Sequence, residues 1–447
     1  MITMPLKKIK ITPLIITLLF FGFCKECPTE PKDPELYLTA PYVETSIVWL
    51  KVSSPDSTLH KSFIIQRDTV TIMEASFLGR DTIIADRNVQ PNTSYTYTVN
   101  YVKNGRIQDQ NASVTVTTLD ISSSDFTWEV LYFGERSGDL NSVSIASENN
   151  IWAVGRTEVW GWDSLYSEYG WLQYNALHWD GLKWNMLSIR PSPWTYKGPF
   201  DVVHAISDSM VWIGIDAPAL YLRGEWQGMM NAPRLGWMLD IWGNSLDNTF
   251  FTYYGGRIAH YDGTKFTVMN SGTLTDLHDI DGNDERVYIA GYSTTAGNER
   301  LILEYIDGSW KKVFQSQTTN GNLSIGDFGR FNSVKVFDNV AVIASAAVAM
   351  LKYYFYDGLV DYFPKSATVL RDCYPIRKID GNAINDIAYM TTSGEIVHFN
   401  GQEYIQIFDY ENQYSKYVSV YGGDFKGDVI CAVGYGSGKG VVIIGRR

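Results

Sequence analysis

Residues 128–447 repeat one short pattern of apolar and polar positions. In each copy an apolar or aromatic segment is followed by a polar residue, a glycine and another aromatic, as in His178-Trp179-Asp180-Gly181. The turn glycines are separated by 39 to 50 residues and are Gly181, Gly224, Gly263, Gly308, Gly358 and Gly401. A period in the forties is typical of a repeat architecture made of short supersecondary units.

Each repeat also contains a strongly apolar segment that predicts its second strand. There are seven of these segments but only six turns, and they cover residues 151–155, 211–214, 250–253, 287–291, 340–344, 386–390 and 430–434. The chain ends at residues 441–444, in the third strand of the last repeat, and an extra strand at 126–131 precedes the first repeat. If this upstream strand completes the last repeat, the array closes and exposed sheet edges disappear. We therefore predict an all-β fold with a seven-bladed β-propeller over residues 121–447, and six or eight blades remain alternatives.

Residues 35–120 alternate apolar and polar positions over several short segments, which predicts a β-sandwich. The sequence Val89-Gln90-Pro91-Asn92-Thr93-Ser94-Tyr95 resembles the fibronectin type III signature before strand F. The resemblance implies that the Tyr95 hydroxyl bonds to the nearby backbone and that Trp49 lies in the core. It also implies a spacer or binding platform. The Gly–aromatic rhythm of the repeats is similar to kelch and related bacterial propellers, and this likeness assigns no functional residues.

The N-terminus predicts an export signal over residues 1–24. Lysines at 7, 8 and 10 precede an apolar run at 13–23, which is too short to span a bilayer. The run ends at Cys24 and resembles a bacterial lipoprotein signal, which implies lipidation of that cysteine. Phe23 departs from the family pattern, which has a small residue there, so an ordinary signal peptide or an uncleaved anchor remains open. Residues 25–34, with prolines at 28, 31 and 34, predict a stiff tether.

Composition excludes some classes of function. The formal charge of −12 argues against a nucleic-acid partner, which requires a basic face. Aromatic residues make up 14% of the chain and glycines number 38, as expected for many short strands joined by turns. Four cysteines are too few for a disulfide framework. We expect an exported monomer, lipid-anchored at a bacterial outer membrane or cell surface.

Three motifs with possible chemistry have simpler interpretations. His178, His260 and His398 occupy one repeated slot that aromatic residues fill in the other repeats, so we predict packing rather than metal binding. Residues 279–285 resemble a calcium loop without its sixth-position Gly and twelfth-position Glu, and we interpret them as a hairpin turn. Residues 434–440 resemble a phosphate loop without its Ser or Thr or its helix. We expect no cofactor and no metal.

An aromatic insertion is the strongest candidate for a functional site. The first repeat carries a long insertion between its second and third strands, and the link to the next repeat is also aromatic. In a four-stranded blade both segments emerge on one face, together with the long links at 315–329 and 364–375. Loops on a rigid scaffold often carry binding sites. The predicted ligand-binding residues are Trp160, Trp162, Tyr166, Tyr169, Trp171, Trp194 and Tyr196.

These aromatics suit stacking on sugars or contact with a protein. Alternatively they pair with one another along their own hairpin. We predict a non-catalytic binding or scaffold protein of the cell envelope that engages a protein or a glycan. The competing hypothesis is a glycan-active hydrolase or lyase with carboxylates at the propeller centre, although the sequence identifies no catalytic pair. A purely structural envelope protein is the third possibility.

Overall fold

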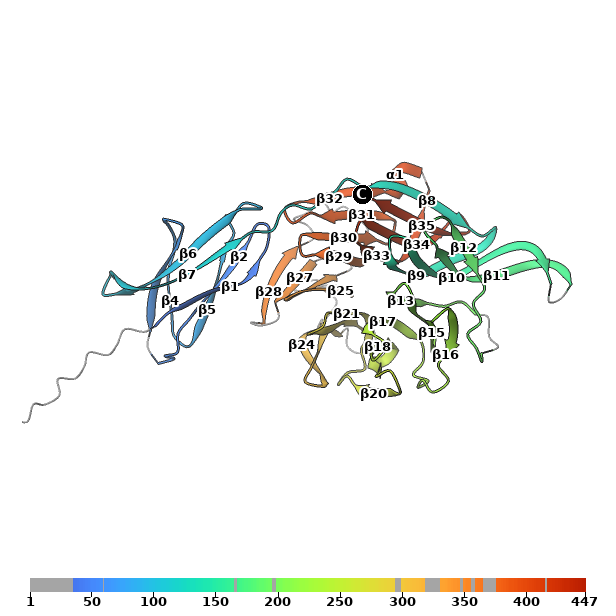
Figure 1. Ribbon diagram of the computed structural model, residues 1–447, viewed down its shortest axis with the longest axis horizontal. Helices are drawn as coiled ribbons and strands as arrows, with labels where there is room; N and C mark the ends of the chain where they lie inside the picture. Colours follow the sequence, from blue (N-terminus) through green and yellow to red (C-terminus); the bar gives the residue numbers. More distant parts are fainter. Residues whose placement is uncertain are drawn as a thin grey trace, which may run out of the picture. The chain divides into compact units, whose positions relative to one another are not determined.

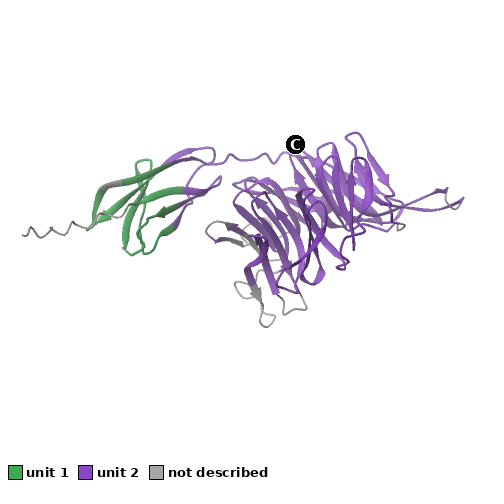
Figure 2. Cartoon of the chain, turned by 60° about the horizontal axis from the view of Figure 1, so that its bottom comes forward, with its two compact units in different colours: residues 1–39, 51–82, 97–114 green, residues 40–50, 83–96, 115–447 purple. Residues whose placement is uncertain are grey.

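The computed structural model describes residues 35–447 except 59, 165–166, 195–197, 294–298, 318–329, 346–348, 355–357, 365–374 and 415. The predicted signal with Cys24 and the predicted tether lie outside the described residues. The chain divides into two compact units, residues 1–39, 51–82 and 97–114 in one and residues 40–50, 83–96 and 115–447 in the other (Figure 2). Among the described residues, no helix has the length and apolar character needed to cross a bilayer.

The strands before residue 120 form two sheets, with strand orders β1-β2-β5 and β4-β3-β6-β7. The Tyr95 hydroxyl accepts a hydrogen bond from the main-chain N–H of Gln90 at 2.9 Å, which is the backbone contact that the resemblance implied. Trp49 is buried, as expected. The strands are β1 (Tyr37–Val43), β2 (Val48–Ser53), β3 (Lys61–Arg67), β4 (Val70–Phe77), β5 (Asp81–Asp86), β6 (Ser94–Lys103) and β7 (Arg106–Thr117).

The described residues from 127 onward form seven four-stranded sheets, here called sheets 1 to 7 (Figure 1). Sheet 1 contains β9 (Arg136–Ser147), β10 (Asn150–Asp163), β11 (Glu168–Trp179) and β12 (Trp184–Leu187). Sheet 2 contains β13 (Val202–Ser207), β14 (Met210–Gly214), β15 (Pro218–Leu222) and β16 (Glu225–Gly228). Sheet 3 contains β17 (Met238–Ser245), β18 (Asn248–Tyr253), β19 (Arg257–Tyr261) and β20 (Phe266–Asn270), with the 3-10 turn η1 (Tyr254–Gly256) between β18 and β19.

Sheet 4 contains β21 (Asp276–Gly282), β22 (Val287–Tyr292), β23 (Glu299–Ile306) and β24 (Ser309–Gln317). Sheet 5 contains β25 (Phe331–Phe337), β26 (Val340–Ser345), β27 (Ala349–Tyr354) and β28 (Leu359–Pro364). Sheet 6 contains β29 (Ile376–Ala383), β30 (Asp386–Thr391), β31 (Glu395–Phe399) and β32 (Tyr404–Asp409). Helix α1 (Tyr410–Tyr414) leads to sheet 7, which contains β33 (Val418–Lys426), β34 (Val429–Gly436), β35 (Lys439–Arg446) and the upstream β8 (Thr127–Phe133).

Sheet 7 joins the two ends of the repeat array. β8 pairs antiparallel with β35, from Thr127 opposite Arg446 to Phe133 opposite Gly440. The predicted pairing of the upstream strand with the terminal hairpin is therefore present. Sheet 7 also packs on sheet 1 through a buried apolar cluster that includes Val143 and Cys431. All seven apolar segments of the repeats lie in the second strands of their sheets, as predicted.

The repeated turns have a local chemical cause. The Asp180 carboxylate accepts the main-chain N–H groups of Leu182 and Lys183 at 3.0 and 2.9 Å, and Gly181 adopts a φ of 88°. Glycine adopts such a left-handed conformation without steric cost, and an aspartate before it closes the turn. These hydrogen bonds, with that from Asn185, lower the pKa of Asp180 to about 2. The turn glycines of the other repeats also have positive φ, namely Gly224, Gly263, Gly308, Gly358 and Gly401.

Sheet 7 depends on close contact between β8 and β35, and this contact predicts the effect of a substitution at Gly445. A Cβ atom at this position would lie 2.6 Å from the Trp128 ring. We expect Gly445→Val to destabilise the protein by about 1–3 kcal/mol, since an overpacked contact forces strands apart. Urea unfolding followed by tryptophan fluorescence measures this effect. Gly170→Ala is the control, because no atom lies within 4 Å of its added Cβ; equal stability of the two variants would contradict the role of β8.

Candidate functional site

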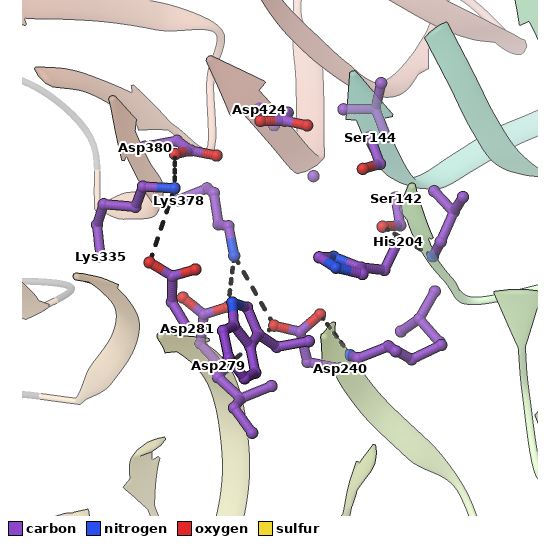
Figure 3. Close-up of a pocket in the computed structure, with 18 of the residues that line it drawn as sticks. Ser142, Ser144, His204, Asp240, Asp279, Asp281, Lys335, Lys378, Asp380 and Asp424 are labelled. Carbon is purple, nitrogen blue, oxygen red and sulfur yellow. Dashed lines mark hydrogen bonds and ion pairs between the residues drawn. The ribbon is translucent and has the colours of Figure 1, made fainter. Parts of the chain in front are cut away.

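The first strands of the seven sheets surround a cavity of about 510 Å³ (Figure 3). Each of these strands is the end strand of its sheet, so one of its edges has no strand partner. A buried main-chain N–H group without an acceptor costs free energy, so these edges require other acceptors. The strands are β9, β13, β17, β21, β25, β29 and β33.

Side chains of the preceding sheet supply those acceptors. The Asp279 carboxylate accepts the main-chain N–H of Val334 at 2.7 Å, and two residues later Asp281 accepts that of Val336 at 2.7 Å. Because the two bonds follow in the same order, β21 and β25 run in the same direction. The same kind of hydrogen bond recurs between other sheets. The side-chain partner and the residue whose main-chain N–H it meets are, in that order, Ser142 and Val203, Ser144 and Ala205, His204 and Gly243, Asp240 and Ile280, Ser333 and Ile379, and Asp424 and Ile145.

Two lysines from the neighbouring sheets 5 and 6 neutralise part of this acidic cavity. Lys378 on β29 forms an ion pair with Asp279 and lies 3.8 Å from Asp240. Lys335 on β25 lies 2.7 Å from Asp380 and 3.7 Å from Asp281. Figure 3 shows both ammonium groups pointing toward these carboxylates. Each lysine thus bridges carboxylates that come from two different sheets.

Burial and these lysines shift the pKa values of neighbouring carboxyl groups in opposite directions. Burial raises the pKa of Asp240 well above its usual value, whereas the Asp279 pKa is lowered because Lys378 and a hydrogen bond from Asp240 outweigh the same burial. Asp424 and Asp380 form a second such pair beside Lys335, in which the Asp424 pKa is raised and the Asp380 pKa is lowered. In each of the two carboxyl pairs, therefore, one pKa is raised and the other is lowered.

Two further titratable groups face the same cavity. Burial raises the pKa of Asp281 to about 6, even though Lys335 opposes this shift. Burial also lowers the pKa of His204 to about 4, so this imidazole is neutral; its Nε2 atom lies 2.8 Å from the Gly243 carbonyl oxygen and 3.1 Å from the Gly243 nitrogen. Lys335 and Lys378 therefore face Asp279 and Asp380, whose pKa values are lowered, and Asp281, whose pKa is about 6.

The carboxylates of the cavity are engaged in contacts that hold neighbouring sheets together. Both Asp279 oxygens are occupied, one by Lys378 and the other by the Ser333 hydroxyl and the Val334 N–H. A glycosidase needs one carboxyl group beside the sugar and a second that acts on water or on the anomeric carbon. Groups that are already bonded to backbone and lysine favour a structural role over that chemistry.

Sequence reasoning missed this cavity. Residues 279–285 were interpreted as a hairpin turn, but Asp279–Gly282 belong to strand β21 and the turn comes after them. The strand extends further because its polar residues bond to the neighbouring sheet instead of to water. A usable signal was present, since Asp-Ile-Asp-Gly-Asn at 279–283 and Lys-Ile-Asp-Gly-Asn at 378–382 place charged residues on alternate positions of two first strands.

The aromatic insertion forms a two-stranded ribbon, residues 157–163 of β10 and 168–174 of β11, which projects beyond the rest of sheet 1 (Figure 1). Trp160 lies opposite Trp171, and Trp162 lies opposite Tyr169. In both pairs the ring centroids are 5.4 Å apart and the rings are nearly perpendicular. The hairpin pairing proposed as the alternative is therefore present.

The ribbon aromatics nevertheless remain open to solvent. Exposed fractions are 51% for Trp160, 53% for Trp162, 65% for Tyr169 and 37% for Trp171. Trp194 lies elsewhere, packed against the buried cluster between sheets 1 and 2. Tyr166 and Tyr196 lie outside the described residues.

The exposed aromatics of the sheets gather on one face. In an antiparallel sheet the start of the first strand, the connection between the second and third strands, and the end of the fourth strand lie at one end. Within the described part of residues 127–447, every aromatic side chain with large exposure lies at these ends or in the segments that join them. They are Trp160, Trp162, Tyr169, Trp171, Trp237, Tyr254, Tyr414, Tyr417, Tyr421 and Tyr435.

The histidines of the repeated slot pack within separate sheets. His178 stacks on Trp152 with ring centroids 4.0 Å apart, and His260 lies 4.3 Å from the Phe250 ring. His398 is fully buried and hydrogen-bonds to Asp386 at 2.8 Å. Among the described residues, no group of three or more His, Cys, Asp or Glu side chains has an arrangement suited to a metal ion.

Comparison with known proteins identifies the fold but no family. No family model matches the sequence. The search of curated proteins also finds no match. A solved structure of YCF48 bound to D1 peptide is similar with a TM-score of 0.52 and 13% identity over 73% of this chain and 97% of that chain.

Two further structures give lower scores. The WD40 repeats of RRP9 match with a TM-score of 0.49 and 9% identity, over 72% of this chain and 99% of theirs. YCF48 from Cyanidioschyzon merolae matches with a TM-score of 0.48 and 12% identity, over 72% of this chain and 98% of that one. The likeness to the structure of YCF48 bound to D1 peptide, with its TM-score of 0.52, shows that the all-β chain resembles β-propeller folds.

The raised pKa of Asp281 predicts a pH-dependent stability. Its protonated form contributes stability that is complete below the unfolded pKa near 4 and is lost as the pH rises through about 6. Asp281→Asn keeps an oxygen for the Val336 N–H but cannot ionise. Between pH 4.5 and 7.5 we expect the wild type to lose roughly 2 kcal/mol more stability than the variant in urea unfolding. Asp262→Asn is the control, because hydrogen bonds from Thr264 and Lys265 lower the pKa of this turn residue to about 2. Identical pH profiles for wild type and Asp281→Asn would refute the assignment.

Proposed function

We propose that this chain is an exported, lipid-anchored binding protein whose seven-bladed propeller engages a protein partner through its aromatic face. The observation that carries the proposal is the gathering of exposed Trp and Tyr side chains at the same end of sheets 1, 3 and 7. Interfaces are enriched in aromatic residues at their centres, and large aromatics account for much of the binding energy there. The ribbon aromatics Trp160, Trp162, Tyr169 and Trp171 are the principal anchors.

Closure of the ring supports a rigid platform for this face. The pairing of β8 with β35 and the packing of sheet 7 on sheet 1 support a seven-bladed propeller closed by its upstream strand. In a closed ring every blade packs between two neighbouring blades, so the ring has no terminal blade that can separate from the rest. Residues 121–447 form this propeller in our proposal, and residues 35–120 form a fibronectin type III-like sandwich that acts as a spacer.

The geometry of the rings favours a protein over a glycan. The paired rings of the ribbon meet at interplanar angles of 71° and 70°, so neighbouring rings do not form one flat platform. Edge-to-face pairs leave angular recesses that suit apolar side chains, whereas sugar rings stack on flat aromatic faces. The YCF48 structure that resembles this chain contains a bound peptide, which is compatible with a peptide-binding role for the same fold.

The binding proposal predicts that removal of the ribbon aromatics abolishes partner capture. We expect Trp160→Ala, Trp162→Ala and Trp171→Ala together to reduce selection of peptides from a displayed random library to background, because exposed anchors are lost while the propeller core is unchanged. Cross-linking of the full chain in cell envelopes provides the second readout. Leu182→Ala is the matched control, since this 89% exposed side chain lies in the turn between the third and fourth strands, at the opposite end of sheet 1. Undiminished capture by the triple variant would exclude the aromatic face, and capture of oligosaccharides alone would favour a glycan ligand.

The anchoring proposal predicts a lipid on Cys24. Mass analysis of the mature protein is expected to show an N-terminus at Cys24 that carries diacylglycerol and acyl chains. Cys24→Ser should move the protein from the detergent phase to the aqueous phase in detergent partitioning, because the lipid supplies the membrane affinity. An unmodified N-terminus at another residue would rule out this anchor.

A further inference from the structure

The outer edge of the aromatic ribbon carries main-chain groups that no strand covers. β12 pairs with β11 only from Ala176 to Trp179, so the edge of residues 168–174 has no strand partner among the described residues. The hydrogen bond from the Trp160 N–H to the Glu135 carboxylate at 3.0 Å shows that this N–H points away from β11. Trp160 and Trp171 therefore form a non-hydrogen-bonded pair.

The two-residue period of a strand extends this assignment along β11. If Trp171 directs its N–H and C=O groups outward, then Tyr169 and Gln173 do so as well, because the register between residues 157–163 and 168–174 has no irregularity. These three residues form a row of donors and acceptors beside the exposed rings. The equivalent edge of β10 is partly blocked, since Glu135 occupies the Trp160 N–H.

Nothing in the sequence of this edge discourages strand addition. Proteins protect free edges with lysine, proline or bulges, and residues 168–174 read Glu-Tyr-Gly-Trp-Leu-Gln-Tyr without any of these. Such an undefended edge binds an extended peptide through main-chain hydrogen bonds, and pockets for alternate side chains supply the specificity.

Charge along the ribbon places the charged residue of such a peptide. At the base, Arg136 and Arg156 contact the Glu158 carboxylate at 3.2 and 2.7 Å, and the Glu135 carboxylate accepts the Trp160 N–H, so two positive and two negative groups lie there. The Arg136 guanidinium lies 4.4 Å from the Trp171 ring centroid. The tip carries Asp163 and Glu168 and is negative.

We infer that the free edge of β11 receives an extended segment of a partner protein as an additional antiparallel strand. The segment has apolar residues at alternate positions and a basic residue at its C-terminal end beside Glu168. Its alternate side chains lie on the same face as Tyr169 and Trp171, in the recesses between the rings. This inference rests on the proposed function and names the partner class for the same face.

The test uses the full chain and the synthetic peptide acetyl-Glu-Val-Thr-Tyr-Thr-Val-Lys-amide, with binding measured by fluorescence anisotropy. We expect Gln173→Pro to weaken binding at least tenfold, because proline removes an outward donor while the bonds inside the ribbon remain. Gln173→Ala is the matched control and retains the donor, so its affinity should equal that of the wild type. Circular dichroism and urea unfolding of both variants verify folding.

Methylated peptides test the hydrogen bonds without changing the protein. Methyl groups on the main-chain nitrogens of the Val and Tyr residues should abolish binding, because these N–H groups face the ribbon in the proposed register. Methyl groups on the Thr nitrogens, which face away, should leave the affinity within about twofold. In the complex, hydrogen exchange should slow at the amides of Tyr169, Trp171 and Gln173 and not at those of Gly170 and Leu172, which are already bonded within the ribbon.

The outcomes separate this inference from the proposed function. Binding that depends on Trp160 and Trp171 but is insensitive to Gln173→Pro and to peptide methylation overturns strand addition and leaves the aromatic face intact. Absence of peptide binding at millimolar concentration also overturns it, and the random library then decides the proposed function independently. Concentration-dependent dimerisation of the full chain that Gln173→Pro abolishes would assign the edge to a second copy instead of a partner.

Discussion

Hydrogen bonds from the main chain of one first strand to side chains of the preceding sheet hold the centre of the seven sheets together. A strand at the end of a sheet has N–H groups that need acceptors, and inside a repeat array water cannot supply all of them. Aspartate, serine and histidine side chains perform this role, for example Asp281 for Val336 and Asp424 for Ile145. Each bond also ties two sheets in one register, so the same contacts that satisfy the backbone align the repeats.

This arrangement buries charged groups, and two lysines that each face two carboxylates offset part of that charge. Carboxylates accept hydrogen bonds more strongly than neutral groups, but several of them in one cavity repel one another. Lys378 and Lys335 each face two carboxylates, and the pKa values of Asp240 and Asp424 are raised while those of Asp279 and Asp380 are lowered. Such pairs stabilise a fold less than their number suggests, because desolvation offsets much of the attraction. They specify instead which sheets lie side by side.

The strand edges that are covered, and those that are not, indicate where a partner can bind this protein. Side chains cover the inner edges, and β8 covers the edge of β35. The ribbon of β10 and β11 extends beyond its neighbours and keeps both exposed rings and an uncovered edge. An uncovered edge that lies beside four large exposed aromatics presents a natural surface for a partner.

The sequence by itself determined the features that depend on neighbours along the chain. The repeat period, the second strands and the turn type follow from residues within a few positions of one another, as with Asp180 and Gly181. The pairing of β8 with the terminal hairpin was also predictable, because an incomplete last repeat and an unmatched strand leave little choice. Only the tertiary structure decided which polar residues meet across sheets. Lys378 and Asp279 lie 99 positions apart, and Trp194, predicted at the binding site, packs into a core instead. Such contacts depend on how neighbouring sheets are aligned, and no short-range pattern in one strand encodes that alignment.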